Sequence, residues 1–273
     1  MKSFKAFLWC KPSLGQSWLL VALIFVGSLL TGIALPHASL SLSYLLMMLL
    51  PLAFCWWLGS EAMLSGGGPV PVNAPDFGKL PAWAFLLLSA VALLALSVVI
   101  EPVTGAIPMP DSVKAIFERL FLNSALWDIV LSTCILAPLL EELLCRGMML
   151  RGMHSRGMAP WKAIFWSAFL FALMHMNPWQ SIPALLIGIF LGWVYWRTRC
   201  LWATIFLHCF NNSVSTVISR LYPDLSIDAG LNDILPPTVY WTVYGVSFLL
   251  LILILYLLHE KTLSPEIQTR LEA

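Results

Sequence analysis

Five polar residues stand in apolar segments of this sequence and have the chemical types of a hydrolytic site. They are Glu141, Glu142, His175, His208 and Asn212. A carboxylate beside an imidazole can take a proton from water. A second imidazole with a neighbouring carboxamide can donate hydrogen bonds to the oxyanion of a tetrahedral intermediate. Together these residue types could hydrolyse an amide without forming a covalent intermediate.

The two glutamates differ in the partners that their own helix offers. Glu142 and Arg146 are four residues apart, in the order that favours an ion pair on one helix face. We therefore predict that Glu142 balances Arg146. Glu141 points about 100° away around the helix and has no charged partner in its own segment. Since an ionised carboxylate is costly inside a bilayer, Glu141 needs a partner from another helix, for which His175 and His208 are the candidates.

Composition shows which elements must position these groups. Hydrophobic residues make up 60% of the 273 residues and charged residues only 11%, whereas soluble domains carry about 25% charged residues. The mean hydropathy is +0.86. A net charge of +1 gives no basic field for a nucleic-acid partner. We therefore predict an integral, multi-pass membrane protein whose main partner is the lipid bilayer.

Apolar stretches of about 20 residues, the length that crosses a bilayer, occur eight times. They lie near 17–35, 40–58, 82–100, 125–149, 162–177, 182–197, 200–219 and 237–258. We predict an all-α fold, a polytopic membrane helical bundle of about eight transmembrane helices. Charged and apolar residues alternate from Asp111 to Phe121, which predicts an amphipathic helix on the membrane surface.

Basic residues predict the orientation of this bundle. If the N-terminus with Lys2, Lys5 and Lys11 is cytoplasmic, the loops after spans four and six are cytoplasmic too. Those loops carry Arg151, Arg156, Lys162, Arg197 and Arg199, whereas the loop after span seven carries Asp224, Asp228 and Asp233. This distribution agrees with the positive-inside rule, so both termini are predicted to be cytoplasmic.

Depth can be estimated by counting about 1.5 Å per residue from the nearest cytoplasmic basic residue. Glu141, His175 and His208 then lie about 14 to 20 Å along their helices, and Asn212 lies one turn deeper. Four residues from three helices are therefore expected to meet at one level, inside the membrane but reachable from the cytoplasmic face.

Three ordered motifs resemble a known family. They are E-E-x-x-x-R-G at Glu141–Gly147, F-x-x-x-H at Phe171–His175, and H-x-x-x-N at His208–Asn212. The pattern, over about residues 125–215, resembles the CAAX protease and bacteriocin-processing (CPBP/ABI) family of glutamic-type intramembrane peptidases. The Ras-converting CAAX endopeptidases belong to that family, whose eight-helix fold agrees with the span count.

The resemblance implies a role for each matched residue. Glu141 and His175 would activate the attacking water, and His208 and Asn212 would form the oxyanion hole. The residues expected to support the site are Glu142, Arg146 and Phe171. No cofactor is implied by this glutamic-type chemistry.

The chain divides around this segment. Residues 1–124 would hold transmembrane helices 1–3 and the amphipathic segment, residues 125–219 the catalytic core with helices 4–7, and residues 220–273 the last transmembrane helix and a short cytoplasmic tail. The predicted substrate is a membrane-associated or hydrophobic peptide or protein. The compact chain favours a bacterial cytoplasmic membrane.

Three alternatives stay open at this point. In a zinc-dependent metallopeptidase, Glu141, His175 and His208 would supply oxygen and nitrogen ligands and leave a position for water, although the sequence has no H-E-x-x-H. A non-catalytic membrane scaffold or bacteriocin self-immunity protein would keep the fold without cleaving anything. A proton-coupled transporter also places Glu and His in a membrane, but no inverted repeat is visible.

Overall fold

The computed structural model describes residues 2–66, 68–222, 224–226 and 228–262, and every regular element in these ranges is a helix. The predicted all-α fold is therefore confirmed. The predicted C-terminal tail, 263–273, lies outside the described residues.

The helices, with η for π-helical segments, are α1 (Lys2–Trp9), α2 (Leu14–Ala34), α3 (Leu40–Leu64), α4 (Ala82–Thr104), α5 (Asp111–Asn123), α6 (Leu126–Ile129), η1 (Val130–Leu136), α7 (Ala137–Glu142), η2 (Leu143–Leu150), α8 (Arg151–Ser155), α9 (Pro160–Leu173), α10 (Pro178–Thr198), α11 (Leu201–Leu221), α12 (Leu231–Ile234) and α13 (Pro237–Thr262).

Five helices, α2, α3, α4, α10 and α13, are long and apolar enough to cross a membrane. Large apolar side chains on them face outward; Ile33 and Leu249, for example, are 71% and 68% exposed. The other predicted spans fall on the helix that contains α7, on α9 and on α11. Helix α9 has only 14 residues, and α11 carries a polar stretch from His208 to Ser215. Length and composition alone therefore support five spans and an apolar, lipid-facing surface.

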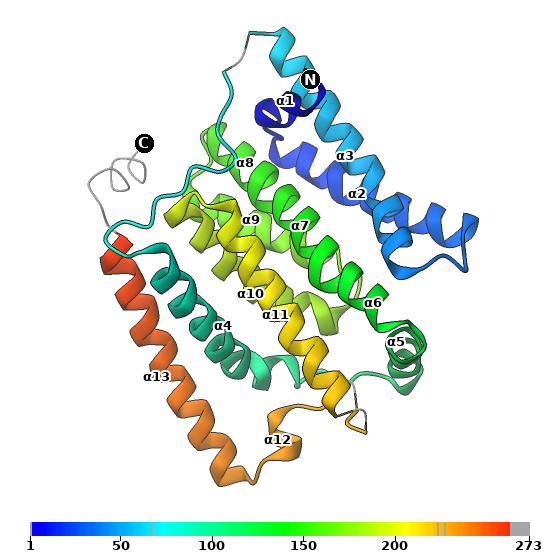
Figure 1. Cartoon of the computed structure of the whole chain (residues 1–273), viewed down its shortest axis with the longest axis vertical. Helices are drawn as coiled ribbons and strands as arrows, with labels where there is room; N and C mark the ends of the chain where they lie inside the picture. Colours follow the sequence, from blue (N-terminus) through cyan, green and yellow to red (C-terminus); the bar gives the residue numbers. More distant parts are fainter. Residues whose placement is uncertain (1, 67, 223, 227, 263–273) are drawn as a thin grey trace.

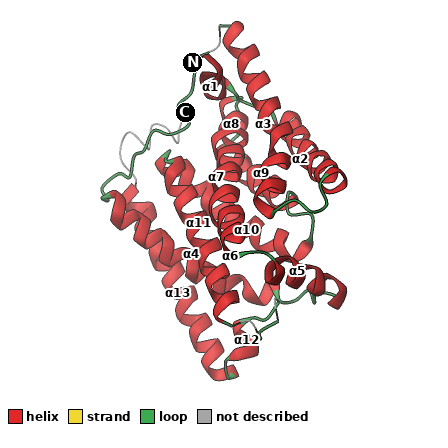
Figure 2. Cartoon of the chain, turned by 45° about the vertical axis from the view of Figure 1, so that its right-hand side comes forward, coloured by secondary structure: helices red, strands yellow, loops and turns green. Residues whose placement is uncertain are grey.

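A continuous helix from Leu126 to Ser155, made of α6, η1, α7, η2 and α8, runs through the middle of the bundle, and we call it the central helix. In Figure 1 it separates the group of α1, α2 and α3 from the group of α4, α10, α11 and α13. Helices α4 and α13 lie side by side, as both views show (Figures 1 and 2). The glutamates are thus carried by the helix that contacts both groups.

The central helix is widened into π-helical turns on both sides of α7. Pro138 explains part of this, because it has no N–H and its ring pushes away the carbonyl four residues earlier. One carbonyl of η1, that of Thr133, accepts a hydrogen bond from Asn212 Nδ2 of α11 at 2.9 Å. Such π-helical turns occur frequently at functional sites. They were not predicted from the sequence.

Helices α9 and α10 pack closely through Gly188 and Gly192. A Cβ at Gly188 would lie 3.1 Å from the Ala168 Cβ, and one at Gly192 would lie 3.1 Å from the Ile164 Cγ2. The absence of side chains therefore lets α10 approach α9, as small residues do between membrane helices. This approach also brings the Gly188 carbonyl within reach of Arg146 of the central helix, at 2.7 Å.

The turn between α9 and α10 differs from the predicted spans. The sequence predicted a span over 162–177, but α9 ends at Leu173 and His175 lies in the turn that follows. Asn177 begins the next helix by accepting a hydrogen bond from Gln180 N at 2.9 Å, and Pro178 occupies the first helical position. The placement of His175 within a spanning helix was therefore wrong, because an N-cap and a proline start α10 directly after it.

Basic residues gather at one end of the bundle, which we call the basic end. Arg151 lies there, 2% exposed, and its guanidinium donates to the backbone carbonyls of Phe7, Leu8, Cys10 and Val70. These bonds tie the segment between α1 and α2, and the segment after α3, to the central helix. Four carbonyl acceptors can satisfy a buried guanidinium without a carboxylate.

The segment after α3 runs across the basic end as a strap over residues 68–80 (Figure 1). Its backbone donates to three different parts of the molecule. Val70 N donates to Leu8 O, Ala74 N to Arg199 O, and Lys79 N to Lys261 O. The strap therefore joins α1, the turn after α10 and the end of α13, and it places their basic residues on one face.

Acidic residues cap the opposite end. The Asp128 carboxylate of α6 accepts hydrogen bonds from Leu40 N and Ser41 N, at 2.8 and 3.0 Å, at the start of α3. The segment from Asp111, predicted to be an amphipathic helix, forms α5. Lys114 of that helix pairs with Asp228 at 2.9 Å. The two ends of the bundle therefore differ in charge.

Candidate active site

The central helix, α9 and α11 carry the predicted site residues. Glu141 and Glu142 close α7, just before the second π-helical segment. His208 and Asn212 lie one turn apart on α11. His175 comes from the turn after α9. The motifs, which are far apart in the sequence, thus approach one another where α11 packs against the central helix.

Glu142 is the centre of a buried ionic cluster. Its Oε1 accepts hydrogen bonds from Arg146 Nη1 at 2.6 Å and from His208 Nδ1 at 2.9 Å. The side chains of Glu142 and Arg146 are fully buried, and that of His208 is 6% exposed. The predicted pairing of Glu142 with Arg146 is therefore confirmed. The structure adds His208, which takes its orientation from the same carboxylate oxygen.

Arg146 is held from two further sides. Its Nη2 donates to the Gly188 carbonyl at 2.7 Å, and its guanidinium carbon lies 5.0 Å from the centroid of the Phe171 ring. A guanidinium over an aromatic face gains from the quadrupole of the ring. Phe171, predicted to support the site, therefore packs against the cation that neutralises Glu142.

Glu141 has a different environment. Its Oε1 accepts a hydrogen bond from the Tyr44 hydroxyl at 2.9 Å, and its Oε2 lies 3.8 Å from His208 Nε2. The second distance is too long for a direct hydrogen bond. Glu141 is 9% exposed, and no lysine or arginine pairs with it among the described residues. The His208 ring thus stands between two carboxylates, bonded to one and facing the other across a gap.

His175 lies beside Phe171 in the turn. Its Nδ1 is 3.0 Å from the Phe171 carbonyl oxygen, and the two rings pack edge to face at 5.0 Å. Phe171 also packs edge to face on His208 at 5.6 Å. No hydrogen bond or ion pair joins His175 to Glu141 in the part of the chain that the structure describes. The structure therefore brings Glu141 and His208 together and places His175 next to them, in contact with their aromatic neighbour.

Asn212 holds α11 against the π-helical segment η1. Its Nδ2 donates to Thr133 O at 2.9 Å, and its Oδ1 accepts from Asn211 Nδ2 at 3.2 Å. A carboxamide has two N–H groups, so one remains after the bond to Thr133. Asn211, the residue before Asn212, is the donor of the hydrogen bond that Asn212 Oδ1 accepts.

The three residues considered as zinc ligands do not fit a metal ion in this arrangement. Within residues 2–262, leaving out the few positions not described, no group of three His, Cys, Asp or Glu side chains is placed to hold one. His175 Nδ1 faces a backbone carbonyl, and His208 Nδ1 is bonded to Glu142. Glu141, His175 and His208 therefore do not converge on one point.

Tyr44 is the residue of this site that the sequence analysis missed. It lies on α3 and reaches Glu141 across 97 residues of sequence. A tyrosine in an apolar span is a detectable feature, because its hydroxyl needs a hydrogen-bond partner when buried. The sequence does not reveal which partner, since nothing in local periodicity relates α3 to the central helix.

Residues 123–214 match the family described as Type II CAAX prenyl endopeptidase Rce1-like. The matched segment contains all three motifs and every residue of the buried cluster. It confirms the resemblance to the CAAX protease family that the motifs predicted. No curated protein and no solved structure matches this chain.

Proposed function

We propose that this chain, with its segment that matches the prenyl endopeptidases, is an intramembrane endopeptidase that uses Glu141 to activate water. One observation carries the proposal. Glu141 is a nearly buried carboxylate that faces an imidazole nitrogen at 3.8 Å, while its neighbour Glu142 is already neutralised by Arg146. A carboxylate without a compensating cation in a low-dielectric site is suited to accept a proton.

The attacking water is proposed to bind in the gap between Glu141 and His208. Two polar atoms 3.8 Å apart can both contact one bridging water. In the proposed step, Glu141 takes a proton from this water as the oxygen adds to the carbonyl carbon of the scissile peptide bond. The C–N bond of the tetrahedral intermediate then breaks, and the proton on Glu141 passes to the leaving amine.

His208 and Asn212 are proposed to stabilise the oxyanion, as the resemblance implies. The bond from His208 Nδ1 to Glu142 fixes the ring, so Nε2 donates to the oxyanion when both ring nitrogens carry a proton. Asn212 keeps one N–H after its bond to Thr133. Two donors on successive turns of α11 can therefore serve one oxygen atom.

His175 is proposed to assist the water from the turn between α9 and α10. This role requires the turn to move toward Glu141 when substrate binds, because no hydrogen bond or ion pair joins the two side chains in the described part of the chain. A short turn between two helices can make such a movement more easily than a residue within a helix. The resemblance assigns the role, and the position of His175 beside Phe171, whose ring also packs on His208, supports it.

The membrane arrangement belongs to the same proposal. We propose eight spans with both termini in the cytoplasm of a bacterial cell, so that the basic end is cytoplasmic. The gathering of Lys11, Arg151, Arg156 and Arg199 at one end supports this orientation. In a variant without native cysteines, a membrane-impermeant maleimide should label Asp233→Cys in intact cells and leave Lys5→Cys unlabelled; the reverse pattern would contradict the orientation.

The substrate is proposed to be a membrane-anchored peptide cleaved near a terminus. The description of the matching family names a CAAX prenyl endopeptidase, and a lipid-modified C-terminal segment would reach the site from the bilayer. Comparative proteomics of cells with wild-type protein and with Glu141→Ala should reveal a terminal peptide that only the wild type releases. Release of the same peptides by both would argue for the scaffold or self-immunity alternative.

The activity itself is tested with Glu141→Gln, which keeps the shape of the side chain and removes its basicity. Purified protein in liposomes is given a farnesylated CAAX peptide, and the released fragment is measured by mass spectrometry. We expect a loss of at least about 100-fold in kcat. The matched control is Glu61→Gln, at an exposed glutamate on α3, which should retain full activity.

Two results would overturn the proposal or its chemistry. Activity of Glu141→Gln within twofold of the wild type would remove Glu141 from catalysis. Loss of activity on chelation, with recovery on addition of Zn²⁺, would replace the glutamic mechanism with the metal-dependent one.

A further inference from the structure

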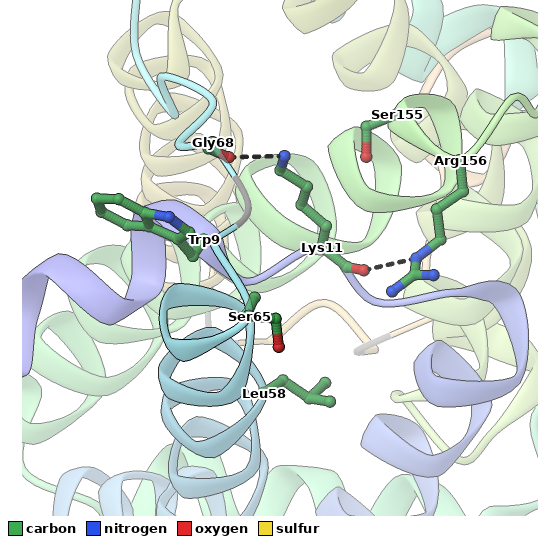
Figure 3. Close-up of a pocket in the computed structure, with 8 residues that line it drawn as sticks. Trp9, Lys11, Leu58, Ser65, Gly68, Ser155 and Arg156 are labelled. Atoms are coloured by element: carbon green, nitrogen blue, oxygen red, sulfur yellow. Dashed lines mark hydrogen bonds between the residues drawn. The ribbon is translucent and has the colours of Figure 1, made fainter.

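A cavity of about 340 Å³ opens at the basic end, away from the glutamates (Figure 3). We call it the Lys11–Arg156 cavity; its lining residues are Trp9, Lys11, Leu58, Ala62, Ser65, Gly68, Ser155 and Arg156. Leu58 follows Tyr44 by 14 positions on α3, which corresponds to about 21 Å along a helix. The cavity is therefore separate from the site in which Tyr44 contacts Glu141.

Two cations, Lys11 and Arg156, line this cavity. Lys11 Nζ donates to Gly68 O at 2.9 Å, and Arg156 Nε donates to Lys11 O at 2.9 Å, as Figure 3 shows. Over the described residues neither cation takes part in an ion pair. An ammonium group has three N–H donors and a guanidinium five, so most donors of both remain after these bonds.

Arg151 shows what a purely structural cation looks like in the same region. Its guanidinium is 2% exposed and is surrounded by four backbone carbonyls. Arg156 is exposed and uses only Nε on the backbone, and Lys11 is half-buried. The excess positive charge and the unused donors of Lys11 and Arg156 therefore face a space that a ligand can enter, and the complementary ligand is an anion.

The rest of the lining indicates which kind of anion. Leu58 and Ala62, on the last turns of α3, and the Trp9 ring at the end of α1 give the cavity an apolar side. Tryptophan and basic residues are the side chains that favour the boundary between headgroups and hydrocarbon. A free phosphate ion would make no use of the apolar side, whereas a phospholipid presents a phosphate and an apolar chain together.

We propose that the Lys11–Arg156 cavity binds an anionic phospholipid, with its phosphate between Lys11 and Arg156 and its chain along Leu58 and Ala62. Basic pockets between membrane helices bind anionic headgroups in this way. The site would join α1, α3 and α8 through one lipid at the membrane surface. This inference does not depend on the proposed peptidase activity.

The test uses the full chain, purified in a neutral detergent and titrated with dioctanoyl phosphatidylglycerol, dioctanoyl phosphatidylcholine or inorganic phosphate. Binding is followed by microscale thermophoresis. We expect saturable binding of phosphatidylglycerol and an increase of about 30-fold in its Kd in the double variant Lys11→Gln and Arg156→Gln, which removes two cations. The conservative pair Lys11→Arg and Arg156→Lys keeps both positive charges and should bind within about threefold of the wild type.

The matched control is the pair Lys5→Gln and Lys162→Gln, which removes two exposed cations outside the cavity and should leave the Kd unchanged. Equal loss in the control pair, or no loss in the cavity pair, would overturn the proposal. Inorganic phosphate bound as tightly as phosphatidylglycerol would assign the cavity to free phosphate instead of lipid. If the double glutamine variant does not fold, Arg156→Gln alone against the conservative pair provides the same comparison.

Discussion

Two of the carboxylate–cation pairs among the described residues have similar lengths but opposite surroundings. Glu142 and Arg146 meet at 2.6 Å inside the bundle, and neither side chain is exposed. Lys114 and Asp228 meet at 2.9 Å between α5 and the loop before α12, where the side chains are 26% and 27% exposed. The distances are alike, but water can replace the partner only in the second pair.

This contrast shows which ion pair positions the proposed site. At the surface, water solvates both charges whether or not they are paired, so the pair contributes little to stability. In the interior, losing one partner leaves a charge without compensation. Glu142 and Arg146 therefore fix the central helix against α10 and α11. Glu141, next to Glu142 but without such a cation among the described residues, is the carboxylate that we propose for catalysis.

The largest effect is expected from breaking the inner pair. Arg146→Met keeps much of the side-chain volume and leaves Glu142 buried without its cation. We expect a loss of about 3–5 kcal/mol in the free energy of unfolding, measured by thermal unfolding in detergent. Adding Glu142→Gln to Arg146→Met should recover a large part of that loss, because no uncompensated charge then remains.

The control variant is Lys162→Met, at an exposed lysine, and its free energy of unfolding should equal that of the wild type. If Arg146→Met were as stable as Lys162→Met, the distinction between the inner and outer pairs would not hold.

Substitutions of the two histidines should show whether a residue near the inner pair is needed for stability, for activity or for both. His208→Ala removes the hydrogen bond to Glu142, so we expect both a lower Tm and a loss of at least about 100-fold in kcat/KM. His175→Ala removes a contact to a backbone carbonyl in a turn, so we expect little change in Tm. Because His175 is proposed to assist the attacking water, we expect a loss of activity similar to that of His208→Ala. A fully active His175→Ala would leave His208 as the imidazole that contacts the water.

Tyr44→Phe should have a smaller effect. It removes one hydrogen bond to Glu141 and keeps the packing of the ring on α3. A net hydrogen bond to a charged group is worth about 1.5 kcal/mol, which corresponds to a decrease of about tenfold in kcat/KM. The control Tyr256→Phe, at a tyrosine that is 62% exposed on α13, should show no decrease. Equal activity of the two variants would mean that Tyr44 does not position Glu141.

Local periodicity was enough to predict part of this arrangement. The spacing of Glu142 and Arg146 predicted their ion pair, and the alternation of charged and apolar residues from Asp111 predicted helix α5. Both features depend on residues within a few helical turns. Apolar length and composition predicted the lipid-facing helices in the same way, because each span is a property of its own segment.

Long-range features could not be predicted. Tyr44 reaches Glu141 only because α3 packs near the central helix, which no periodicity encodes. Asn212 of α11 donates to a carbonyl in η1, a contact between two helices that no local pattern in either segment encodes. The position of His175 was misjudged because the hydropathy of its segment outweighed the local sequence Asn177–Pro178, which starts α10.

The smallest effect is expected from the outer pair, and its dependence on pH can be given a sign. Burial raises the pKa of Asp228. The hydrogen bond from Ser226 and the ion pair with Lys114 together lower it by more than burial raises it, so the pKa lies below its ordinary value. A carboxyl group with a lowered pKa in the folded state stabilises the protein above its unfolded pKa of about 3.9. That contribution is lost as the pH falls through the folded pKa.

We therefore expect Asp228→Asn to lower the Tm by no more than about 2 °C at pH 7. The difference from the wild type should be the same at pH 5, decrease below about pH 4, and vanish in more acidic solution, where Asp228 is protonated in both states. Thermal unfolding of both proteins across this range measures it. A difference as large as that of Arg146→Met, or one that grows as the pH falls, would mean that the outer pair behaves as a buried one.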